Sequence, residues 1–426
     1  MDNQNQNPVN QQTQNAQTPE SVVNPNISPS ANPTPNSKSH KKTLIALVVA
    51  LVIVIVGGSV FAFYHSKHHT KTNATATITN TASTTKTSTP PLVTNTWTGK
   101  DNNYNWNEAN NWSLGIPTNN QILEINVANI VLPANDANFN FQNDISNLTI
   151  NKLVIDGQSS KTVGFDITGN PLTVTSGIDD TATATNAISY STEIQINIQV
   201  NIVGNAAIVT NGHNMLTFYS SDSGEEINLG KSSLQFTVSD SSQIDISGAI
   251  VGTGDILFAN NGISSKGLVM FETSSPNFNG KVVIGSGDSV SVGNQDNNGG
   301  YGSVDAFGTS SVDIMSDGTM VVFAAGTSSF SINNPISVSG NGITQSNGSV
   351  TGAISGCVTS AEEGCGANEN ITFTGQVKLL GNTQIGQSTP SSLGANNTHV
   401  SYTFNNIDKN GYSLNTVTDY FYNAEF

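Results

Sequence analysis

The chain has 426 residues, of which 39 are glycine and only 10% are charged, and its formal net charge is −16. All 14 basic residues are lysine, so the chain has no guanidinium group that could hold a phosphate with two hydrogen bonds. From Trp97 onward there are 8 lysines and 28 acidic residues, and this balance argues against nucleic acid as a partner because phosphate binding requires a basic surface.

The first 63 residues consist of a polar tail and an apolar run. Residues 1–42 are rich in Asn, Gln and Pro, and we expect them to be disordered because they cannot bury enough apolar surface to offset the entropy of ordering. Thr43 to Phe63 is a run of 21 uncharged residues, which as a helix would be about 31 Å long and would match a hydrocarbon core of about 30 Å. A cleaved signal peptide is the alternative, but the preceding segment is too long and no A-x-A-like site follows. We therefore predict a single-pass signal-anchor helix.

Charges on the two sides of this predicted helix indicate its orientation. Lys38, Lys41 and Lys42 precede it, whereas only Lys67 and Lys71 follow closely, and positive charge favours the cytoplasmic side. We expect a cytoplasmic tail (1–42), a transmembrane helix (43–63), a Thr/Ser-rich extracellular linker (64–95) and an ectodomain (96–426). The predicted location is the plasma membrane, with the C-terminal domain outside the cell.

The chain has two cysteines, Cys357 and Cys365, separated by a short loop. Outside the membrane two nearby thiols are expected to form a disulfide, which for so short a loop would stabilise the fold by about 2–3 kcal/mol. Free thiols and a metal site are the alternatives, although neither His213 nor His399 lies nearby in the sequence. We expect no cofactor and no metal.

From Ile122 onward, apolar and polar residues alternate in short runs between turns rich in Gly, Asn, Asp and Ser. The clearest run places Ile194, Ile196, Ile198, Val200 and Ile202 at strict period two, with amide side chains between them. This period puts the aliphatic residues on one face of a strand and the amides on the other. Many short strands of this kind predict an all-β fold: a solenoid, a sandwich or a barrel.

The start of this region contains all three tryptophans, Trp97, Trp106 and Trp112. They form the pattern W-x-G followed by W-x-x-A-x-N-W, which resembles the N-terminal cap of many bacterial surface β-helix proteins. A layer of indole rings would cover the end of a solenoid core that is otherwise exposed. An aromatic platform for sugar binding is the alternative.

Ile246 to Val292 resembles the autotransporter-associated β-strand repeat. The glycines of G-x-I-x-G-x-G and the N-F-x-G turn that follows are represented by Gly252, Gly254, Asn277, Phe278 and Gly280. The resemblance implies a right-handed parallel β-helix; β-sandwich domains are the alternative. At about 20–25 residues per coil, the ectodomain would have about 13–16 coils.

The β-helix scaffold also carries polysaccharide lyases and hydrolases, so an enzyme is the main competing hypothesis. Pectate-lyase-like chemistry uses an arginine base, which this chain lacks. Asp179, Asp180 and His213 resemble the paired aspartates and G-H-G of polygalacturonase-like enzymes, but the other motifs of that family are missing. Two carboxylates at suitable separation would be required.

These observations favour a bacterial membrane-anchored surface protein that is not an enzyme. Its β-solenoid ectodomain would act in adhesion, by binding glycans or proteins of another cell surface, or as a structural surface element. The Trp cap and the amide-rich face of Glu193 to Asn201 are the candidate contacts. A surface polysaccharide hydrolase is the alternative.

Overall fold

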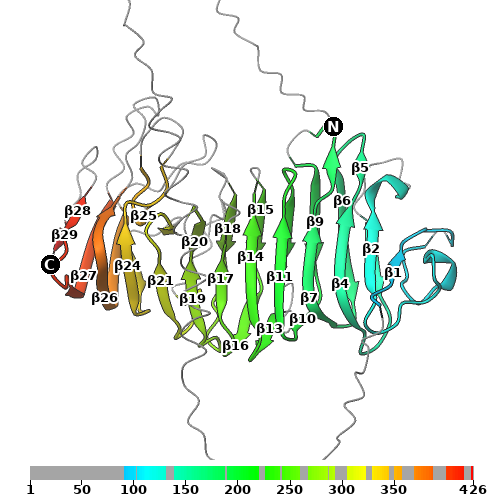
Figure 1. Ribbon diagram of the computed structural model, residues 1–426, viewed down its shortest axis with the longest axis horizontal. Coiled ribbons are helices and arrows are strands. Elements are labelled where there is room, and N and C mark those ends of the chain that lie inside the picture. The colour runs from blue at the N-terminus through cyan, green and yellow to red at the C-terminus, as the bar shows by residue number, and fades with distance from the viewer. Residues whose placement is uncertain are drawn as a thin grey trace, which may run out of the picture. The chain divides into compact units, whose positions relative to one another are not determined.

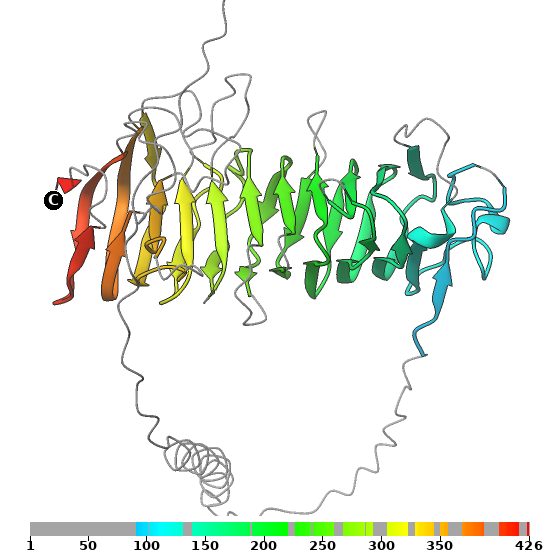
Figure 2. The same ribbon diagram turned by 90° about the horizontal axis from the view of Figure 1, so that it is seen from above.

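The computed structural model describes residues 91–101, 103–130, 139–187, 190–219, 226–239, 242–259, 267–285, 287–292, 305–322, 329–344, 350–356, 369–386, 400–416 and 424–425. They form an all-β parallel solenoid that spans residues 94–416 and has about 9 complete turns (Figures 1 and 2). The predicted tail, transmembrane helix, most of the linker and the predicted Cys357–Cys365 disulfide lie outside the described residues. Within the described ranges, no helix has the length and apolar character needed to cross a membrane.

The described strands join into one 27-stranded sheet, with β5 (Gln158–Ser159) and β8 (Thr183–Ala184) paired separately. This sheet winds around the core as three parallel ladders. The first ladder, labelled across Figure 1, contains β1 (Thr94–Thr96), β2 (Ile122–Asn126), β4 (Thr149–Asp156), β7 (Leu172–Asp180), β11 (Asn205–Thr210), β14 (Ser233–Val238), β17 (Ile256–Phe258), β19 (Lys281–Ile284), β21 (Ser311–Ile314), β24 (Ile336–Gly340), β26 (Glu369–Ile385) and β27 (Val400–Asp408).

The other two ladders follow in each turn. The second ladder contains β3 (Phe139–Asn143), β6 (Val163–Gly169), β9 (Thr192–Ile196), β12 (Met215–Phe218), β15 (Gln243–Ile246), β18 (Leu268–Phe271), β20 (Ser289–Val292), β22 (Thr319–Val322), β25 (Ile354–Gly356), the end of β26, and β28 (Leu414–Thr416). The third contains the starts of β4 and β7, then β10 (Val200–Ile202), β13 (Glu226–Gly230), β16 (Ala249–Gly252), β23 (Ser329–Ile332), the starts of β26 and β27, and β29 (Ala424–Glu425). Two short 3-10 helices, η1 (Ala109–Asn111) and η2 (Val127–Asn129), lie near the N-terminal end.

The strand pairings decide between the solenoid and the sandwich. Every pairing between named strands in the described part is parallel, and each joins residues about one turn apart. A β-sandwich is built from antiparallel sheets. The alternative of β-sandwich domains is therefore wrong, and the predicted parallel β-helix is confirmed, while its handedness stays a prediction.

The core is a set of aliphatic and aromatic columns that run along the solenoid. In the first ladder one inward-facing column continues through ten successive strands without a polar residue, and each of these side chains is at most 1% exposed. Its members are Leu123, Leu153, Ile178, Ile208, Phe236, Phe258, Ile284, Ile314, Val338 and Leu379. Because each side chain packs on the one before and after it, the interior is close-packed along its length.

Most turns are longer than the coil length of about 20–25 residues assumed from the sequence. The turns from Leu123 to Leu153 and from Ile284 to Ile314 each have 30 residues, whereas the turn from Phe236 to Phe258 has 22. Corner loops and the N-terminal cap add residues that contribute no strand. The expected 13–16 coils were therefore too many, because about 9 complete turns account for the described solenoid.

The glycines of the predicted repeat lie where successive turns approach most closely. A Cβ on Gly254 would lie 1.7 Å from the backbone oxygen of Ser232, and a Cβ on Gly280 would lie 1.9 Å from the backbone oxygen of Gly254. Gly252 bridges Phe278, whose ring is fully buried. The spacing of the motif thus places one glycine above another at a corner that has no room for a Cβ atom.

The three tryptophans pack together at the N-terminal end of the solenoid, beside β1 and β2. Trp97 meets Trp112 edge to face at 5.0 Å between ring centroids, and Trp106 meets Trp112 at 5.8 Å. Trp97 also lies 4.9 Å from Phe141 of β3, whose ring meets that of Phe165 in the next turn at 4.8 Å. All three indoles are buried, so their faces cover the first turn and are not displayed on the surface.

Candidate functional site

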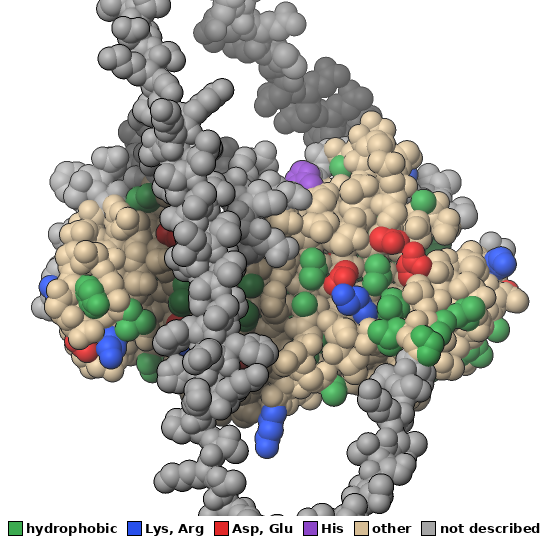
Figure 3. All heavy atoms as spheres, viewed as in Figure 1, with side chains coloured by type: hydrophobic (Ala, Val, Ile, Leu, Met, Phe, Trp, Pro, Cys, Tyr) green, Lys and Arg blue, Asp and Glu red, His purple; other side chains and the backbone are tan. Residues whose placement is uncertain are grey.

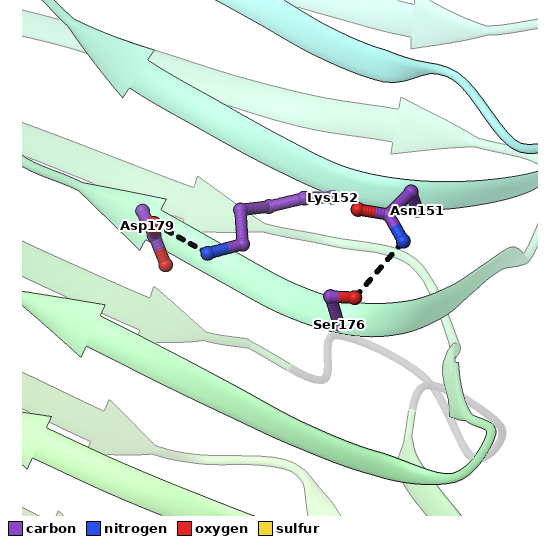
Figure 4. A network of polar contacts seen from close by, with 4 residues as sticks. All are labelled: Asn151, Lys152, Ser176 and Asp179. Atoms are coloured by element: carbon purple, nitrogen blue, oxygen red, sulfur yellow. Dashed lines mark hydrogen bonds and ion pairs between the residues drawn. The ribbon is translucent and has the colours of Figure 1, made fainter. Parts of the chain in front are cut away.

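Asp179 and Asp180, adjacent in β7, have separate environments. Asp179 points outward and accepts an ion-pair hydrogen bond from Lys152 of β4 at 2.8 Å. Figure 4 shows this pair beside the hydrogen bond from Asn151 to Ser176. Asp180 points into the core and is fully buried. The two carboxyl groups therefore do not form the outward-facing pair that a polygalacturonase-like site would need.

The buried carboxyl group of Asp180 is held by three donors. The Thr192 hydroxyl donates to Oδ2 at 2.6 Å, and Asn214 Nδ2 donates to Oδ1 at 2.9 Å. Burial raises the pKa of Asp180 to about 7, although hydrogen bonds from Thr192, the Ala182 backbone and Asn214 act in the opposite direction. In this environment the neutral acid and the carboxylate are close in free energy near neutral pH.

His213 lies on the turn that closes over this corner. Its backbone is left-handed, with φ of 66°, and its ring centroid lies 5.3 Å from that of Tyr190. The backbone oxygen of His213 accepts a hydrogen bond from Ser191 at 2.7 Å. The histidine ring is exposed and the Asp180 carboxyl is buried, so they do not meet as an acid–base pair.

A second polar cluster lies on the outer face of the second ladder. The Tyr190 hydroxyl donates to Oε1 of Gln243 at 3.1 Å, and Nε2 of Gln243 donates to Oδ1 of Asp245 at 2.8 Å. Asp245 is only 8% exposed although it lies on an outward-facing position of β15. The cluster therefore orients one largely buried carboxyl through a relay of hydrogen bonds that crosses two turns.

Glu272 brings a second carboxyl group to this cluster. Its Oε2 accepts a hydrogen bond from the Ser247 hydroxyl at 2.5 Å. Burial raises the pKa of Asp245 to about 7; Gln243 lowers it, and the charge of Glu272 raises it further. The site thus combines a carboxyl group that can be protonated near neutral pH with a nearby acidic residue.

The third ladder carries a different feature, a column of small uncharged polar side chains. Thr149, Thr173, Asn201 and Asn228 occupy the same outward position on four successive turns. Asn228 Nδ2 donates to Oδ1 of Asn201 at 3.2 Å. We call these four residues the Thr/Asn column. Parallel strands repeat every 4.7–4.9 Å, so hydroxyl and amide groups recur along the solenoid at about that spacing.

The amide-rich run of Glu193 to Asn201 crosses a corner between the second and third ladders. Ile194, Ile196, Ile198, Val200 and Ile202 are all buried, as the period-two pattern predicted. The residues between them are half-buried and lie on two faces, since β9 and β10 belong to different ladders. The run is therefore not one flat amide face, and only Asn201 continues into the Thr/Asn column.

Charged side chains are sparse on the visible face of the solenoid. In Figure 3 they appear as a few acidic and basic groups, some of them side by side, within a surface of uncharged polar atoms and apolar side chains. Among the described residues, no group of three or more His, Cys, Asp or Glu side chains has the arrangement of a metal site.

Comparisons with protein-family models, with curated proteins and with solved structures gave no match. The cluster of Tyr190, Gln243, Asp245 and Glu272 was not among the residues predicted from the sequence, and its members lie as many as three turns apart. The signal that could have found it is the spacing of 27 residues between Asp245 and Glu272, which is about one turn.

Proposed function

We propose that this chain is a membrane-anchored bacterial surface protein whose solenoid acts as an adhesin for uncharged polysaccharides. The observation that carries the proposal is the Thr/Asn column, a straight row of hydroxyl and amide groups supported by a close-packed core. The net charge of −16 would disfavour anionic polymers through like-charge repulsion.

The chemistry of the column fits a repeating ligand. Each hydroxyl or amide group contributes little net free energy, because a hydrogen bond to a sugar replaces one to water. A rigid row presents several such groups at once, and the combined affinity then exceeds that of any single contact. In the described part, Nδ2 of Asn201 has no protein acceptor, so it is available to donate to a sugar oxygen.

The predicted anchor and linker give this column its place in the mechanism. The apolar run at Thr43 to Phe63 would hold the chain in the membrane, and the Thr/Ser-rich linker would carry the solenoid away from it. In this proposal the protein displays the column to another surface.

The full chain, solubilised in mild detergent, tests the proposal on a panel of insoluble neutral and anionic polysaccharides. Retention on neutral polymers and the release of reducing ends are scored in the same wells. Retention without new reducing ends is the expected result. Absence of retention on every polymer would refute the adhesin.

A polysaccharide hydrolase is the second candidate function, and the Asp245–Glu272 cluster is the observation that favours it. Glycoside hydrolysis uses one protonated carboxyl group as acid and one carboxylate as base or nucleophile. A pKa of Asp245 near 7 suits the acid, and Glu272 would supply the second group. New reducing ends from the wild type that disappear in Asp245→Asn would favour this function over adhesion.

A further inference from the structure

Three buried side chains of different chemistry meet inside the solenoid at the corner between the first and second ladders. Asp180, Thr192 and Asn214 are each 0% exposed. The Asp180 carboxyl group contacts both of the other side chains. Its Oδ2 accepts a hydrogen bond from the Thr192 hydroxyl at 2.6 Å, and its Oδ1 accepts one from Asn214 Nδ2 at 2.9 Å. A nucleophile, a carboxamide and an acid–base group are thus held together away from water.

The register places the hydroxyl and the carboxamide on neighbouring turns. Glu193 pairs with Met215, so the preceding residues, Thr192 and Asn214, follow each other in the same column. The hydrogen bond from the Ser191 backbone to the His213 backbone oxygen, 2.7 Å, keeps this alignment up to the corner. Neighbouring strands lie about 4.8 Å apart, a separation that one ester linkage between two short side chains can span.

We propose that Thr192 and Asn214 become joined by an intramolecular ester bond, with Asp180 as the acid–base group. The Asp180 carboxylate takes the hydroxyl proton of Thr192, and Oγ1 attacks Cγ of Asn214. The bond between Cγ and Nδ2 then breaks as the Asp180 carboxyl group delivers the proton to the departing nitrogen. The products are one ester and one ammonia molecule, and no oxidant or other reactant is required.

The contacts already in place match each proton transfer. Thr192 Oγ1, which loses a proton, and Asn214 Nδ2, which gains one, both form a hydrogen bond with the Asp180 carboxyl group. The leaving nitrogen also donates to the backbone oxygen of Ala182 at 3.0 Å and to that of Asp180 at 3.4 Å, which would stabilise its protonated form. Burial supports the reaction in two ways: it keeps the neutral form of Asp180 accessible near neutral pH, and it excludes the water that would hydrolyse the ester.

The ester would connect two consecutive turns of the solenoid covalently. Like a disulfide, it would restrict the unfolded chain and so slow the separation of the turns under load. This inference concerns the interior of the fold and is independent of polysaccharide binding.

The test is the intact mass of the full-length chain after reduction and correction for N-terminal processing. The expected mass is lower than that of the sequence by one ammonia molecule, and a digest is expected to contain the Thr192 peptide linked to the Asn214 peptide. A succinimide at an asparagine would lose the same mass, but it would link no peptides and would persist in Thr192→Val. A wild-type mass equal to that of the sequence, or a mass loss without this linked pair, would overturn the proposal.

Two variants assign the roles. Thr192→Val removes the nucleophile with little change in shape, and Asp180→Asn removes the base while keeping the size of the side chain. Each is expected to have the full mass of its own sequence. A linked pair in Asp180→Asn would overturn the role of Asp180.

Discussion

Asp179 and Asp180 are neighbours in the chain, yet one forms an outward ion pair with Lys152 and the other lies fully buried in the core. The alternation of side chains along β7 separates them, because successive residues of a strand face opposite sides. A pair of acidic residues in the sequence therefore becomes two unrelated groups in the fold.

The outward ion pair is expected to contribute little to stability. The side chains of Lys152 and Asp179 are 28% and 22% exposed, so solvent screens their attraction. Asp179→Asn should lower the free energy of unfolding by about 1 kcal/mol or less, and the effect should shrink at high salt. Urea unfolding at low and high ionic strength measures this. A loss of several kcal/mol would contradict the assignment of Asp179 to a partly exposed surface pair.

The tryptophan cap gives a prediction that compares two similar substitutions. Trp112 Nε1 donates to the backbone oxygen of Trp106 at 3.0 Å, whereas Nε1 of Trp106 has no acceptor in the described part although it is buried. Trp112→Phe should therefore cost about 1–3 kcal/mol more than Trp106→Phe, because only the former loses a buried hydrogen bond. The two midpoints of urea unfolding test this order, and the reverse order would refute the assigned hydrogen bond.

The stacked glycines of the repeat motif predict a steric effect. Gly254→Ala would place a methyl group 1.7 Å from the Ser232 backbone oxygen, so adjacent turns must move apart. We expect a loss of at least about 2 kcal/mol or a failure to fold. Gly381→Ala is the matched control, since its Cβ would meet only the Ser339 Cβ at 3.2 Å. Equal midpoints of thermal unfolding for the two variants would contradict the close approach.

The buried carboxyl of Asp245 predicts how stability depends on pH. Burial raises its pKa from 3.8 to about 7, so the folded state favours the protonated form. The contribution of the Asp245 carboxyl to the free energy of unfolding is fully present below the pKa that this group has in the unfolded chain. It is lost as the pH rises from about 4 through 7, with an upper limit of about 4 kcal/mol. In Asp245→Asn the free energy of unfolding should therefore fall less as the pH rises through this range.

The measurement is the free energy of urea unfolding of both proteins between pH 4 and pH 8. Ser247→Ala is a suitable control because it changes a neighbour of Glu272 without removing a carboxyl group. An unchanged pH profile in Asp245→Asn would show that the Asp245 carboxyl is ionised throughout and is not buried as described.

The fold was largely predictable because its main signals are local. The period-two run from Ile194 to Ile202 placed five aliphatic side chains in the core, and all five are buried. The glycines of the repeat motif marked a corner, since a close backbone approach requires glycine wherever it occurs.

The polar clusters were not predictable, because they depend on register between turns of unequal length. Tyr190 and Gln243 are 53 residues apart, yet they share a hydrogen bond, and Asp180 meets Asn214 across 34 residues. A shift of one residue in any corner would send these side chains to the opposite face. The number of coils was overestimated for the same reason, since corner lengths cannot be read from an alternating pattern.

If the Thr/Asn column binds the polysaccharide, retention of the full chain on a neutral insoluble polymer must depend on the amide groups of this column. The double variant Asn201→Val, Asn228→Val removes both amides and keeps strand-forming side chains, and Gln235→Val makes the same kind of change on the outward face of the first ladder. We expect the double variant to be retained at least about tenfold more weakly than the wild type, and the Gln235→Val control to be retained as well as the wild type. Equal retention by the wild type and the double variant would contradict binding by this column.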